Sequence, residues 1–586
     1  MHKLLRRYTL KAAGESGQGV NSVGEILAKS LKESGLYTFG YREYPSLIKG
    51  GYACHQIDIS DQPLTSPSSM TDLLVCMSRV SFHAYLPTVR EHGQIIHNLR
   101  QLELTPAEKA LVEQRHLKIA YLPAETIAME TGGKALMSNV VLIGALWQLI
   151  GLDLEPVKAV LRAEFADKPE FIDANLACLD RGYQEKLADL EKVSLPFTLV
   201  PVREHDALLS GNALISLGAI AAGVRAYFAY PMTPSSSILG YLSSAYHDTG
   251  MLVKQVEDEI SVAQMAIGSM FAGTRALVGT SGGGFDLMTE SVTMAAMTET
   301  PFVCILGQRP GPATGLPTWT AAGDLNIAVY AGHGEYSRCV MALSDAESAY
   351  TLIQKAFNIA EKFQTVVIVL TEKQIAESLF QLTDLPANEP IERGLVPDQE
   401  IEKIQSSDRY KQTETGVSPR WLPGQSDAVF DANSDEHTAD GSLTEEAGPT
   451  LAMYNKRLRK QAVIEAALPE PEILGPTKAN LSFVGWGSTK NTLLDVMEIW
   501  NKTHPDFTFN YLHFEYVFPV KTQVFKQFVA EAQKIVLIEN NALGQLGALL
   551  TQQTGYQFVK RFLKYDGRAF FPEDIIEYLE TERKTS

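Results

Sequence analysis

Cysteine is scarce in this sequence of 586 residues, with five in all and no two at the spacing of a Cys-x-x-Cys motif. They are Cys54, Cys76, Cys178, Cys304 and Cys339. Disulfide frameworks need a much higher cysteine density, and zinc or iron–sulfur sites need several thiolates that lie together. We therefore expect no disulfide framework, and no zinc or iron–sulfur site built wholly from this chain.

Positive charge is also in short supply. Lysine and arginine number 51 against 69 aspartates and glutamates, which gives a formal net charge of −18. An excess of negative charge repels phosphate backbones and anionic lipid headgroups. Nucleic acid and membrane surfaces are therefore not expected as partners.

Long apolar runs are absent as well. The longest, around residues 140–150, is too short to cross a bilayer, which takes about 20 apolar residues in a helix. The N-terminus begins with basic residues but reaches Gly14 before an apolar signal-peptide segment could form. These features predict a soluble protein of the cytoplasm.

What the sequence does contain is an ordinary globular composition, with 45% hydrophobic and 20% charged residues. At roughly 100–200 residues per domain, its length predicts about three to five domains. Short apolar runs alternate with helix-length segments, a pattern typical of parallel α/β sheets. We predict an α/β fold of three units, at residues 1–195, 205–387 and 481–586, with an irregular connector at 388–480.

The predicted connector has an uneven charge distribution. Residues 426–447 hold seven acidic side chains and no lysine or arginine, and a basic run follows at Lys456–Lys460. Such a segment is typical of a solvated linker. An ordered excursion that packs on another subunit is the alternative interpretation.

A glycine-rich turn, Gly14–Gly19 (GESGQG), stands between a predicted strand and a predicted helix. A dinucleotide fingerprint occupies that place, but its middle glycine is Ser16 here, and glycine there lets the backbone approach a pyrophosphate. No acidic residue ends a recognisable second strand about 20 residues further on. The pattern therefore favours a tight turn over an NAD site.

Two loops of the second unit carry residues suited to anion binding. Tyr230–Ser237 (YPMTPSSS) offers hydroxyl groups near a helix start, which suits a carboxylate or phosphate, although a plain helix cap is the alternative. Gly307–Thr318 (GQRPGPATGLPT) holds a single cation, Arg309, which could bind a carboxylate bidentately. Because ligands bind outside the carboxyl ends of parallel strands, we expect these loops to form a site.

A third segment, Val256–Gly273, begins with three acids, Glu257, Asp258 and Glu259. Acids in a first helical turn often do no more than compensate the helix dipole. The turns that follow are so apolar, however, that the helix must be buried. We therefore expect one of the three carboxylates to face a desolvated pocket, where its pKa rises.

Taken in chain order, several loop motifs resemble the α subunit of the 2-oxoacid:ferredoxin oxidoreductases. They are YPMTPSS, the acidic helix, TSGGGFDLMTE, QRPGPATGLPT, AAGDL, GHGEYSR, DEHTADG, KRLRK, IENNALGQL and KYDGRAFFPEDI. The first unit resembles the γ domain of that family fused in front, with the loops GESGQGV and YPSLIKGG. The resemblance implies a γ-domain α/β sheet, a thiamine-diphosphate-binding domain of the pyrimidine type and a smaller domain like the C-terminal domain of transketolase.

Enzymes of this family use thiamine diphosphate to cleave a 2-oxoacid, pass two electrons to ferredoxin through iron–sulfur clusters and form an acyl-CoA. By position, Glu259 resembles the carboxylate that hydrogen-bonds the aminopyrimidine ring, with Glu257 as the alternative. Tyr230, Pro231 and Thr233 resemble residues that lie beside the cofactor. These assignments rest on the resemblance alone.

The resemblance also implies a substrate site. Thr233 and Arg309 resemble the groups that hold the keto and carboxylate ends of the substrate, with Thr318 beside them, and Lys49 is expected to reach toward the substrate or CoA. A fused γ–α chain resembles the 2-oxoglutarate enzymes, so we expect reversible conversion of 2-oxoglutarate to succinyl-CoA and CO2. Arg309 neutralises only one carboxylate, and an enzyme for pyruvate or for a broad range of 2-oxoacids is the alternative.

Two parts of the family's active site are missing from this sequence. It holds no GDG…N segment for a Mg²⁺-bound diphosphate, and its cysteines cannot hold a [4Fe–4S] cluster. Both are therefore expected on a separate β subunit, in an (αβ)₂ heterotetramer that reduces ferredoxin. The chain alone is expected to be inactive and colourless and to bind thiamine diphosphate weakly. A non-oxidative thiamine enzyme and a non-catalytic regulatory subunit are the remaining alternatives.

Overall fold

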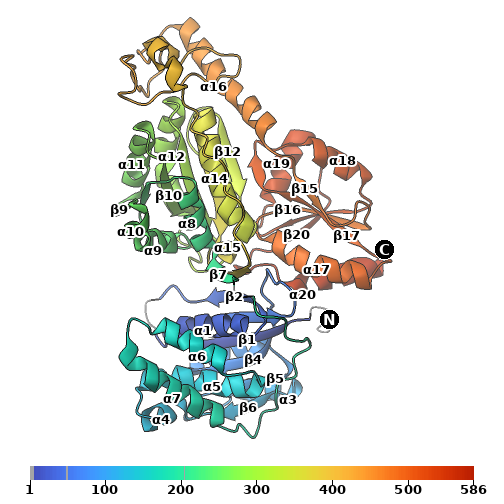
Figure 1. Ribbon diagram of the computed structural model, residues 1–586. Helices are drawn as coiled ribbons and strands as arrows, with labels where there is room; N and C mark the ends of the chain where they lie inside the picture. The colour runs from blue at the N-terminus through green and yellow to red at the C-terminus, as the bar shows by residue number, and fades with distance from the viewer. Residues whose placement is uncertain (1–5, 48–49, 204, 586) are drawn as a thin grey trace.

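The computed structural model of the chain describes residues 6–47, 50–203 and 205–585. It contains three α/β units, each built on its own sheet, with a connector that projects away from the first unit (Figure 1). The predicted α/β fold class is confirmed. No helix among the described residues is long and apolar enough to cross a membrane.

The first unit is built on an eight-stranded sheet of order β6-β5-β4-β1-β3-β2-β14-β7. Its strands are β1 (Tyr8–Ser16), β2 (Tyr37–Glu43), β3 (Gly50–Ser60), β4 (Thr71–Cys76), β5 (Val89–His97), β6 (Lys118–Tyr121), β7 (Ala207–Ser210) and β14 (Leu379–Leu382). Its helices are α1 (Val20–Glu33), α2 (Arg79–Tyr85), α3 (Pro106–Gln114), α4 (Ala124–Glu130), α5 (Ser138–Ile150), α6 (Glu155–Glu164) and α7 (Ile172–Gln184).

This first sheet is mixed, whereas the sequence pattern predicts a parallel one. β1 pairs with β4 in parallel but with β3 antiparallel, and β2 and β3 are antiparallel to each other. The chain between β2 and β3 is too short for the crossover that parallel neighbours need, so the two strands form a hairpin. β7 and β14, which flank the second unit in sequence, extend the same sheet beyond β2.

The second unit holds a seven-stranded sheet of order β18-β12-β13-β11-β10-β8-β9. Its own strands are β8 (Ala226–Ala229), β9 (Leu252–Gln255), β10 (Ala276–Ser281), β11 (Phe302–Gln308), β12 (Arg338–Ala342) and β13 (Val366–Glu372), all parallel where they pair. Its helices are α8 (Gly211–Ala221), α9 (Ser236–Ser244), α10 (Tyr246–Thr249), α11 (Glu259–Phe271), α12 (Gly282–Met297), α13 (Leu325–Tyr330), α14 (Ala346–Phe363) and α15 (Lys373–Ala376).

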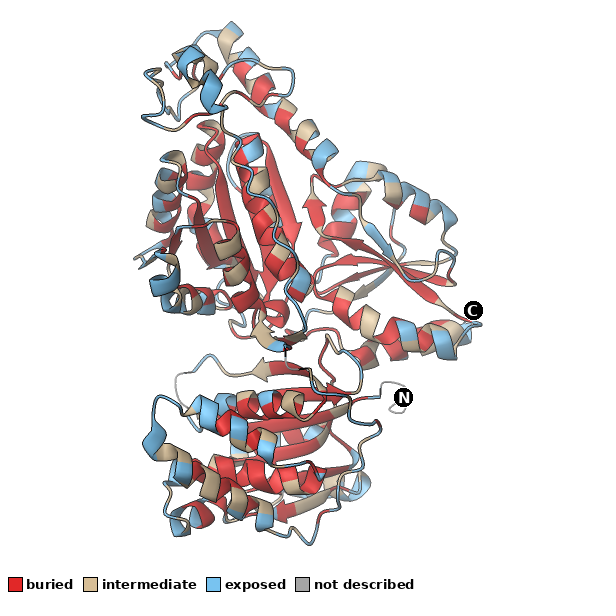
Figure 2. Ribbon diagram, in the orientation of Figure 1, coloured by how far each residue is buried: buried red, intermediate tan, exposed pale blue. Residues whose placement is uncertain are grey.

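Helices cover both faces of this second sheet, and β10, β11 and β13 are buried along their whole length (Figure 2). Parallel strands that are covered on both faces have continuous apolar sequences, because no face meets water. The run TVVIVL at residues 365–370 has this composition and forms most of β13. The sheet therefore provides a rigid base for the loops at its edge.

The third unit carries a five-stranded sheet of order β15-β17-β16-β19-β20. Its strands are β15 (Glu472–Leu474), β16 (Leu481–Trp486), β17 (Phe509–Phe514), β19 (Ile535–Glu539) and β20 (Lys560–Leu563), while β18 (Tyr516–Phe518) joins the second sheet. Its helices are α17 (Thr489–Thr503), α18 (Gln523–Glu531), α19 (Gln545–Thr554) and α20 (Pro572–Thr585). Trp486 and Phe514 belong to the apolar cluster of the second unit, so the two units pack against each other, while Phe483 and Trp500 belong to a separate core within the third unit.

The connector contains a long helix, α16 (Ala447–Ala467), that begins near the top of the view in Figure 1 and runs toward the third unit. The linker interpretation predicts that the basic run on this helix is solvated, but the structure shows otherwise. Lys456 and Lys460 are buried, and both form ion pairs with the buried carboxylate of Glu299, two residues after α12. Arg409 adds hydrogen bonds to the carbonyl groups of Thr298 and Glu299. The connector is thus fastened to the second unit.

The first and third units are joined by a carboxylate on α17. Asp495 accepts hydrogen bonds from the backbone N–H groups of Thr65 and Ser66 at 3.2 Å and 3.0 Å, and forms an ion pair with buried Arg7 at 2.7 Å. Charge-assisted hydrogen bonds of this kind are stronger than neutral ones. They fix the orientation of the first unit relative to the third.

Candidate functional site

Three neighbouring parallel strands of the second sheet end at the same edge. β10 pairs in parallel with β8 on one side and with β11 on the other. The loop that begins at Tyr230 follows β8, the start of α12 follows β10, and the loop that contains Arg309 follows β11. The sequence-predicted loops therefore meet at the carboxyl ends of the strands, which is where open parallel sheets bind ligands.

The structure brings Thr233 and Arg309 into contact. Nη1 of Arg309 donates a hydrogen bond to the backbone carbonyl of Thr233 at 3.1 Å. The side-chain amide of Asn212 on α8 holds the same loop by donating to the Pro234 carbonyl and the Ser237 hydroxyl, both at 2.7 Å. Burial lowers the pKa of Arg309, while the charge of Asp324 opposes that shift. Arg309 is thus a fixed, partly desolvated cation that faces an acid.

Glu259 is the first residue of α11 and is only 5% exposed, whereas Glu257 and Asp258 are exposed. Asp258 caps the helix by accepting a hydrogen bond from the Ser261 N–H at 2.7 Å, and its backbone adopts φ 62°. A non-glycine residue at positive φ is strained, and such strain is concentrated at functional sites. This turn directs the following residue, Glu259, inward.

The carboxylate of Glu259 lies against the first turn of α12. A Cβ at Gly284 would lie 2.8 Å from Oε1 of Glu259 and closer still to the hydroxyl of Thr280. Only glycine at this position leaves room for both groups. The helix after β10 is therefore shaped around the Glu259 side chain.

Several buried polar atoms near these loops have no hydrogen-bond partner within the described part of the chain. They are Asn212 Oδ1, the Tyr227 hydroxyl, Thr280 Oγ1, Ser281 Oγ, Thr318 Oγ1 and Asp324 Oδ2. Buried polar groups are nearly always satisfied in folded proteins, and each exception needs an explanation. These unpartnered atoms therefore mark the carboxyl ends of β8, β10 and β11 as a candidate place for a polar ligand.

Asp324 is a site residue to which the sequence assigns no role, although it lies in the motif AAGDL. Burial, together with the charge of Asp286, raises the pKa of its carboxyl to about 6 against the opposing charge of Arg309. Oδ2 of Asp324 would lie 2.9 Å from a Cβ at Gly282, which begins α12. The side chain thus faces the same edge of the sheet as Glu259, and its importance follows from burial, which no local sequence pattern reveals.

The other predicted site residues fall around this edge. Thr318 is 5% exposed, Tyr230 is partly buried and Pro231 is exposed at the tip of its loop. Lys49 lies outside the described residues. Tyr44, earlier in the same sequence motif, donates its hydroxyl to both carboxylate oxygens of Glu377 at 2.7 Å and 2.9 Å, which holds Tyr44 against the second unit.

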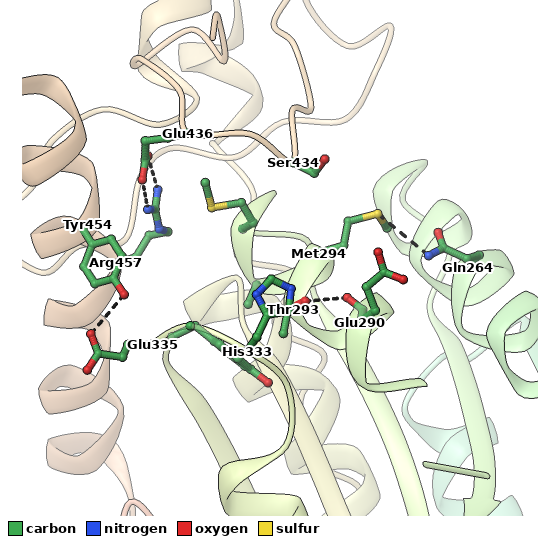
Figure 3. Close-up of a pocket in the computed structure, with 14 residues that line it drawn as sticks. Gln264, Glu290, Thr293, Met294, His333, Glu335, Ser434, Glu436, Tyr454 and Arg457 are labelled. Atoms are coloured by element: carbon green, nitrogen blue, oxygen red, sulfur yellow. Dashed lines mark hydrogen bonds and ion pairs between the residues drawn. The ribbon is translucent and has the colours of Figure 1, made fainter. Parts of the chain in front are cut away.

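A separate cavity of about 440 Å³ lies further along α11 and α12 (Figure 3). Its walls come from these two helices, from the loop at His333 and Glu335, and from α16 of the connector. Arg457 forms hydrogen bonds at 2.9 Å and 2.6 Å with the two oxygens of Glu436, and the Tyr454 hydroxyl donates to Glu335 at 3.1 Å. This cavity is distinct from the edge that holds Glu259.

Two family models match the chain. One, described as pyruvate flavodoxin/ferredoxin oxidoreductase, thiamine diphosphate-binding, matches residues 217–455, and one described as pyruvate ferredoxin/flavodoxin oxidoreductase matches residues 9–185. The first match contains Glu259, Thr233 and Arg309. The sheet edge described above therefore lies within the part that resembles a thiamine-diphosphate-binding domain.

Relatives match over almost the full length of the chain. The α subunit of a 2-oxoacid:ferredoxin oxidoreductase from Sulfolobus sp. is 29% identical over 97% of this chain and 95% of its own length. The 2-oxoglutarate oxidoreductase subunit KorA of Mycobacterium tuberculosis is 27% identical over 98% of this chain and 91% of its own. A solved structure of the 2-oxoglutarate:ferredoxin oxidoreductase from Magnetococcus marinus, with 2-oxoglutarate, coenzyme A and succinyl-CoA bound, superposes with a TM-score of 0.88, 27% identity and coverage of 98% and 99%.

Proposed function

Because the chain belongs to the 2-oxoacid:ferredoxin oxidoreductases, with the γ and α parts fused, we propose that it contributes one half of a thiamine diphosphate site and the substrate-binding loops of such an enzyme. The proposed reaction is the CoA-dependent, reversible conversion of 2-oxoglutarate to succinyl-CoA and CO2, with reduction of ferredoxin. The observation that carries the proposal is the buried Glu259 carboxylate at the same sheet edge as Thr233 and Arg309.

Thiamine diphosphate, when bound, supplies the carbanion chemistry that breaks the bond between the carboxylate and the keto carbon of a 2-oxoacid. In the proposal, the Glu259 carboxyl group would form a hydrogen bond with the aminopyrimidine ring. Tyr230 and Pro231 border that ring. Glu257 is the weaker choice for the same role, because its side chain is exposed and water would compete for the hydrogen bond.

Substrate orientation is assigned to the loops after β8 and β11. Arg309 binds the carboxylate next to the keto group, and Thr233 and Thr318 face the keto oxygen. The hydrogen bond from Arg309 to the Thr233 carbonyl supports this assignment, because it sets the guanidinium beside the threonine loop before substrate arrives. Lys49 is proposed to meet the second carboxylate of 2-oxoglutarate or a phosphate of CoA.

The remaining parts of the enzyme are proposed to lie on a β subunit. That subunit would hold the diphosphate through Mg²⁺, carry the [4Fe–4S] cluster and pass electrons to ferredoxin, in an (αβ)₂ assembly. The relative from Sulfolobus is named as an α subunit, which supports the presence of a second chain. A broader 2-oxoacid range, pyruvate included, is the second candidate, because both matching family models are named for pyruvate.

The proposal is tested by co-expressing this chain with its β subunit and measuring CoA-dependent viologen reduction with a panel of 2-oxoacids. We expect the highest kcat/KM for 2-oxoglutarate and no turnover by this chain alone. Glu259→Gln should lower turnover on the order of 100-fold or more, as expected for a lost proton-transfer group. Glu257→Gln, the matched control, should leave turnover unchanged.

Three outcomes would overturn parts of this proposal. Turnover by the single chain would exclude the divided active site. Full turnover by the Glu259→Gln complex would favour a non-catalytic subunit. A complex that decarboxylates 2-oxoacids without reducing viologen would be a non-oxidative thiamine enzyme.

A further inference from the structure

The sequence motif IENNALGQL has no part in the proposed reaction, yet it lies beside the candidate site. It spans the end of β19, the turn that follows and the start of α19. α19 packs against α13, which begins directly after Asp324, and Figure 1 shows α19 on the side of the third unit that faces the second. The motif therefore meets the segment that carries Asp324.

That segment, residues 318–326, joins the loop of Arg309 to α13. Residues 319–324 belong to no helix or strand, and Ala321 and Ala322 are buried. Buried backbone N–H and C=O groups outside regular structure need partners elsewhere. The sequence Ala-Ala-Gly at 321–323 offers no polar side chain by which the segment could be anchored, so the segment must be held through its backbone.

The turn after β19 supplies partners for this backbone. The N–H of Ala322 donates to the carbonyl of Asn540 at 2.8 Å, and the side-chain amide of Asn541 donates to the carbonyl of Ala322 at 3.0 Å. Asn541 is itself fixed, because its amide also donates to buried Glu539 at 2.8 Å and its oxygen accepts from the Gly544 N–H at 2.7 Å. Ala322 is thus held by a rigid part of the third unit.

Gln545, the first residue of α19, holds the segment on both sides of Asp324. Its amide donates to the carbonyl of Gly323 at 2.7 Å, and its oxygen accepts from the N–H of Asn326 at 2.9 Å. Gln545 is 7% exposed, so water does not compete for these bonds. The N–H of Asp324 donates to Gln308 at the end of β11 at 3.0 Å. The position of Asp324 therefore depends on a side chain from the third unit.

The third unit also holds the Thr318 end of the segment. The N–H of Thr320 donates to the carbonyl of Gly567 at 3.1 Å. The guanidinium of Arg568 lies 3.4 Å from the centre of the Trp319 ring. Gly567 and Arg568 belong to KYDGRAFFPEDI, a second motif that has no part in the proposed reaction. Both ends of the segment are thus fixed relative to the third unit.

We propose that the third unit positions the segment 318–326, with Gln545 and Asn541 as positioning residues. They hold Thr318 and Asp324 in place before a 2-oxoacid binds. The inference rests on the proposed function, which sets the substrate beside Thr318. Groups that are fixed in advance bind a substrate without first having to be ordered, and a displacement of about 1 Å can cost on the order of 100-fold in rate.

The first test is steady-state kinetics of the co-expressed complex. Gln545→Ala removes both hydrogen bonds, and we expect the KM for the 2-oxoacid to rise about 10-fold. Gln545→Met, which preserves the side-chain volume but makes neither bond, should give the same KM. The matched control is Gln552→Ala, because exposed Gln552 on the same helix accepts from the hydroxyl of Tyr330 on α13 at 2.7 Å. Its KM should stay within about twofold of wild type.

Two kinetic outcomes would refute the proposal. A merely structural contact would lower kcat through a smaller folded fraction and leave KM unchanged. An equal rise in KM for Gln552→Ala and Gln545→Ala would show that any loss of contact between α19 and α13 has the same effect.

Hydrogen exchange of the full chain, read by mass spectrometry, tests the same contacts without turnover. In Gln545→Ala the N–H of Asn326 loses its acceptor, so peptides that cover residues 318–330 should exchange at least ~10-fold faster than in wild type. Peptides that cover residues 230–237, in the loop after β8, should exchange at the wild-type rate. Unchanged exchange at 318–330 would overturn the proposal.

Failure of the positioning can be told apart from failure of the proposed function. Turnover of the wild-type complex with the panel of 2-oxoacids tests the function. Exchange in the chain tests whether the third unit holds the segment, whether or not the complex turns over. Faster exchange with an unchanged KM would mean that the segment is held without any benefit to substrate binding, which also overturns the proposal.

Discussion

Replacing Asp324 by asparagine should stabilise the isolated chain at neutral pH. Burial is the largest cause that raises the pKa of this carboxyl from 3.8 to about 6, and Arg309 only partly offsets it. The folded chain therefore holds this charge at a disadvantage. At 1.36 kcal/mol per pKa unit, the ionised carboxylate destabilises the folded chain by at most about 3 kcal/mol. Asp324→Asn removes this destabilisation.

The pH dependence of this effect has a definite sign. Between pH 3.8 and about 6 the folded chain binds more protons at Asp324 than the unfolded chain does. The contribution of this group to the free energy of unfolding therefore falls as the pH rises through that window. Asparagine does not titrate, so the gain from Asp324→Asn should be absent near pH 4, grow toward pH 6 and stay constant above it.

The assay is urea unfolding of wild type and variant, followed by tryptophan fluorescence at pH 4, 5, 6 and 7. Asp286→Asn serves as a second background, because removing the neighbouring like charge lowers the pKa of Asp324. In that background, Asp324→Asn should raise the free energy of unfolding by less than it does in wild type. A variant less stable than wild type at pH 7 would refute the reasoning, as would an equal gap at pH 4 and pH 7.

Three further outcomes follow from the site and the connector. Gly284→Ala places a Cβ 2.8 Å from Oε1 of Glu259, so turnover of the complex should fall on the order of 100-fold while circular dichroism stays unchanged; full turnover would contradict this. Arg309→Lys keeps the charge but loses the fork geometry, and steady-state kinetics should show a KM for the 2-oxoacid raised about 10-fold or more, with thiamine affinity unaffected. Glu299→Gln leaves buried lysines without their carboxylate and should lower the free energy of unfolding by about 3–5 kcal/mol. Burial lowers the pKa of Lys456 to about 8 even with Glu299 beside it, and loss of the carboxylate lowers that pKa further. Because a neutral lysine tolerates burial, the difference in stability between wild type and Glu299→Gln, measured by thermal unfolding, should narrow as the pH rises toward 8.

The sheet edge that holds the candidate site could be predicted from local sequence. Strand-then-loop patterns at Arg225–Pro231 and Thr300–Pro312 correspond to β8 and β11, and both strands pair with β10. Hydrophobic strands bounded by glycine and proline are local features, and parallel order then brings their carboxyl ends together. The roles of individual residues at this edge remain predictions, although burial favours Glu259 over Glu257.

The connector could not be predicted in the same way. The basic run at Lys456–Lys460 has the composition of a solvated face, yet its partner, Glu299, lies 157 residues earlier in the chain. The same limit applies to Asp324, because its raised pKa depends on burial and on Asp286, neither of which is visible in the motif AAGDL. Both the burial of the basic run and the raised pKa of Asp324 depend on residues that are distant in sequence.

The positions of strands β7 and β14 bear on whether the chain could be split into two polypeptides. They belong in sequence to the borders of the second unit, yet they extend the sheet of the first unit beyond β2. The segment between α7 and β7 is therefore not what holds the first unit in place, since strand pairing and the contacts of Asp495 do so independently. If the gene were split at this segment, the two products would meet through surfaces that already exist. Fusion and separation of the γ and α parts are thus architecturally equivalent, and a change between them requires no new interface.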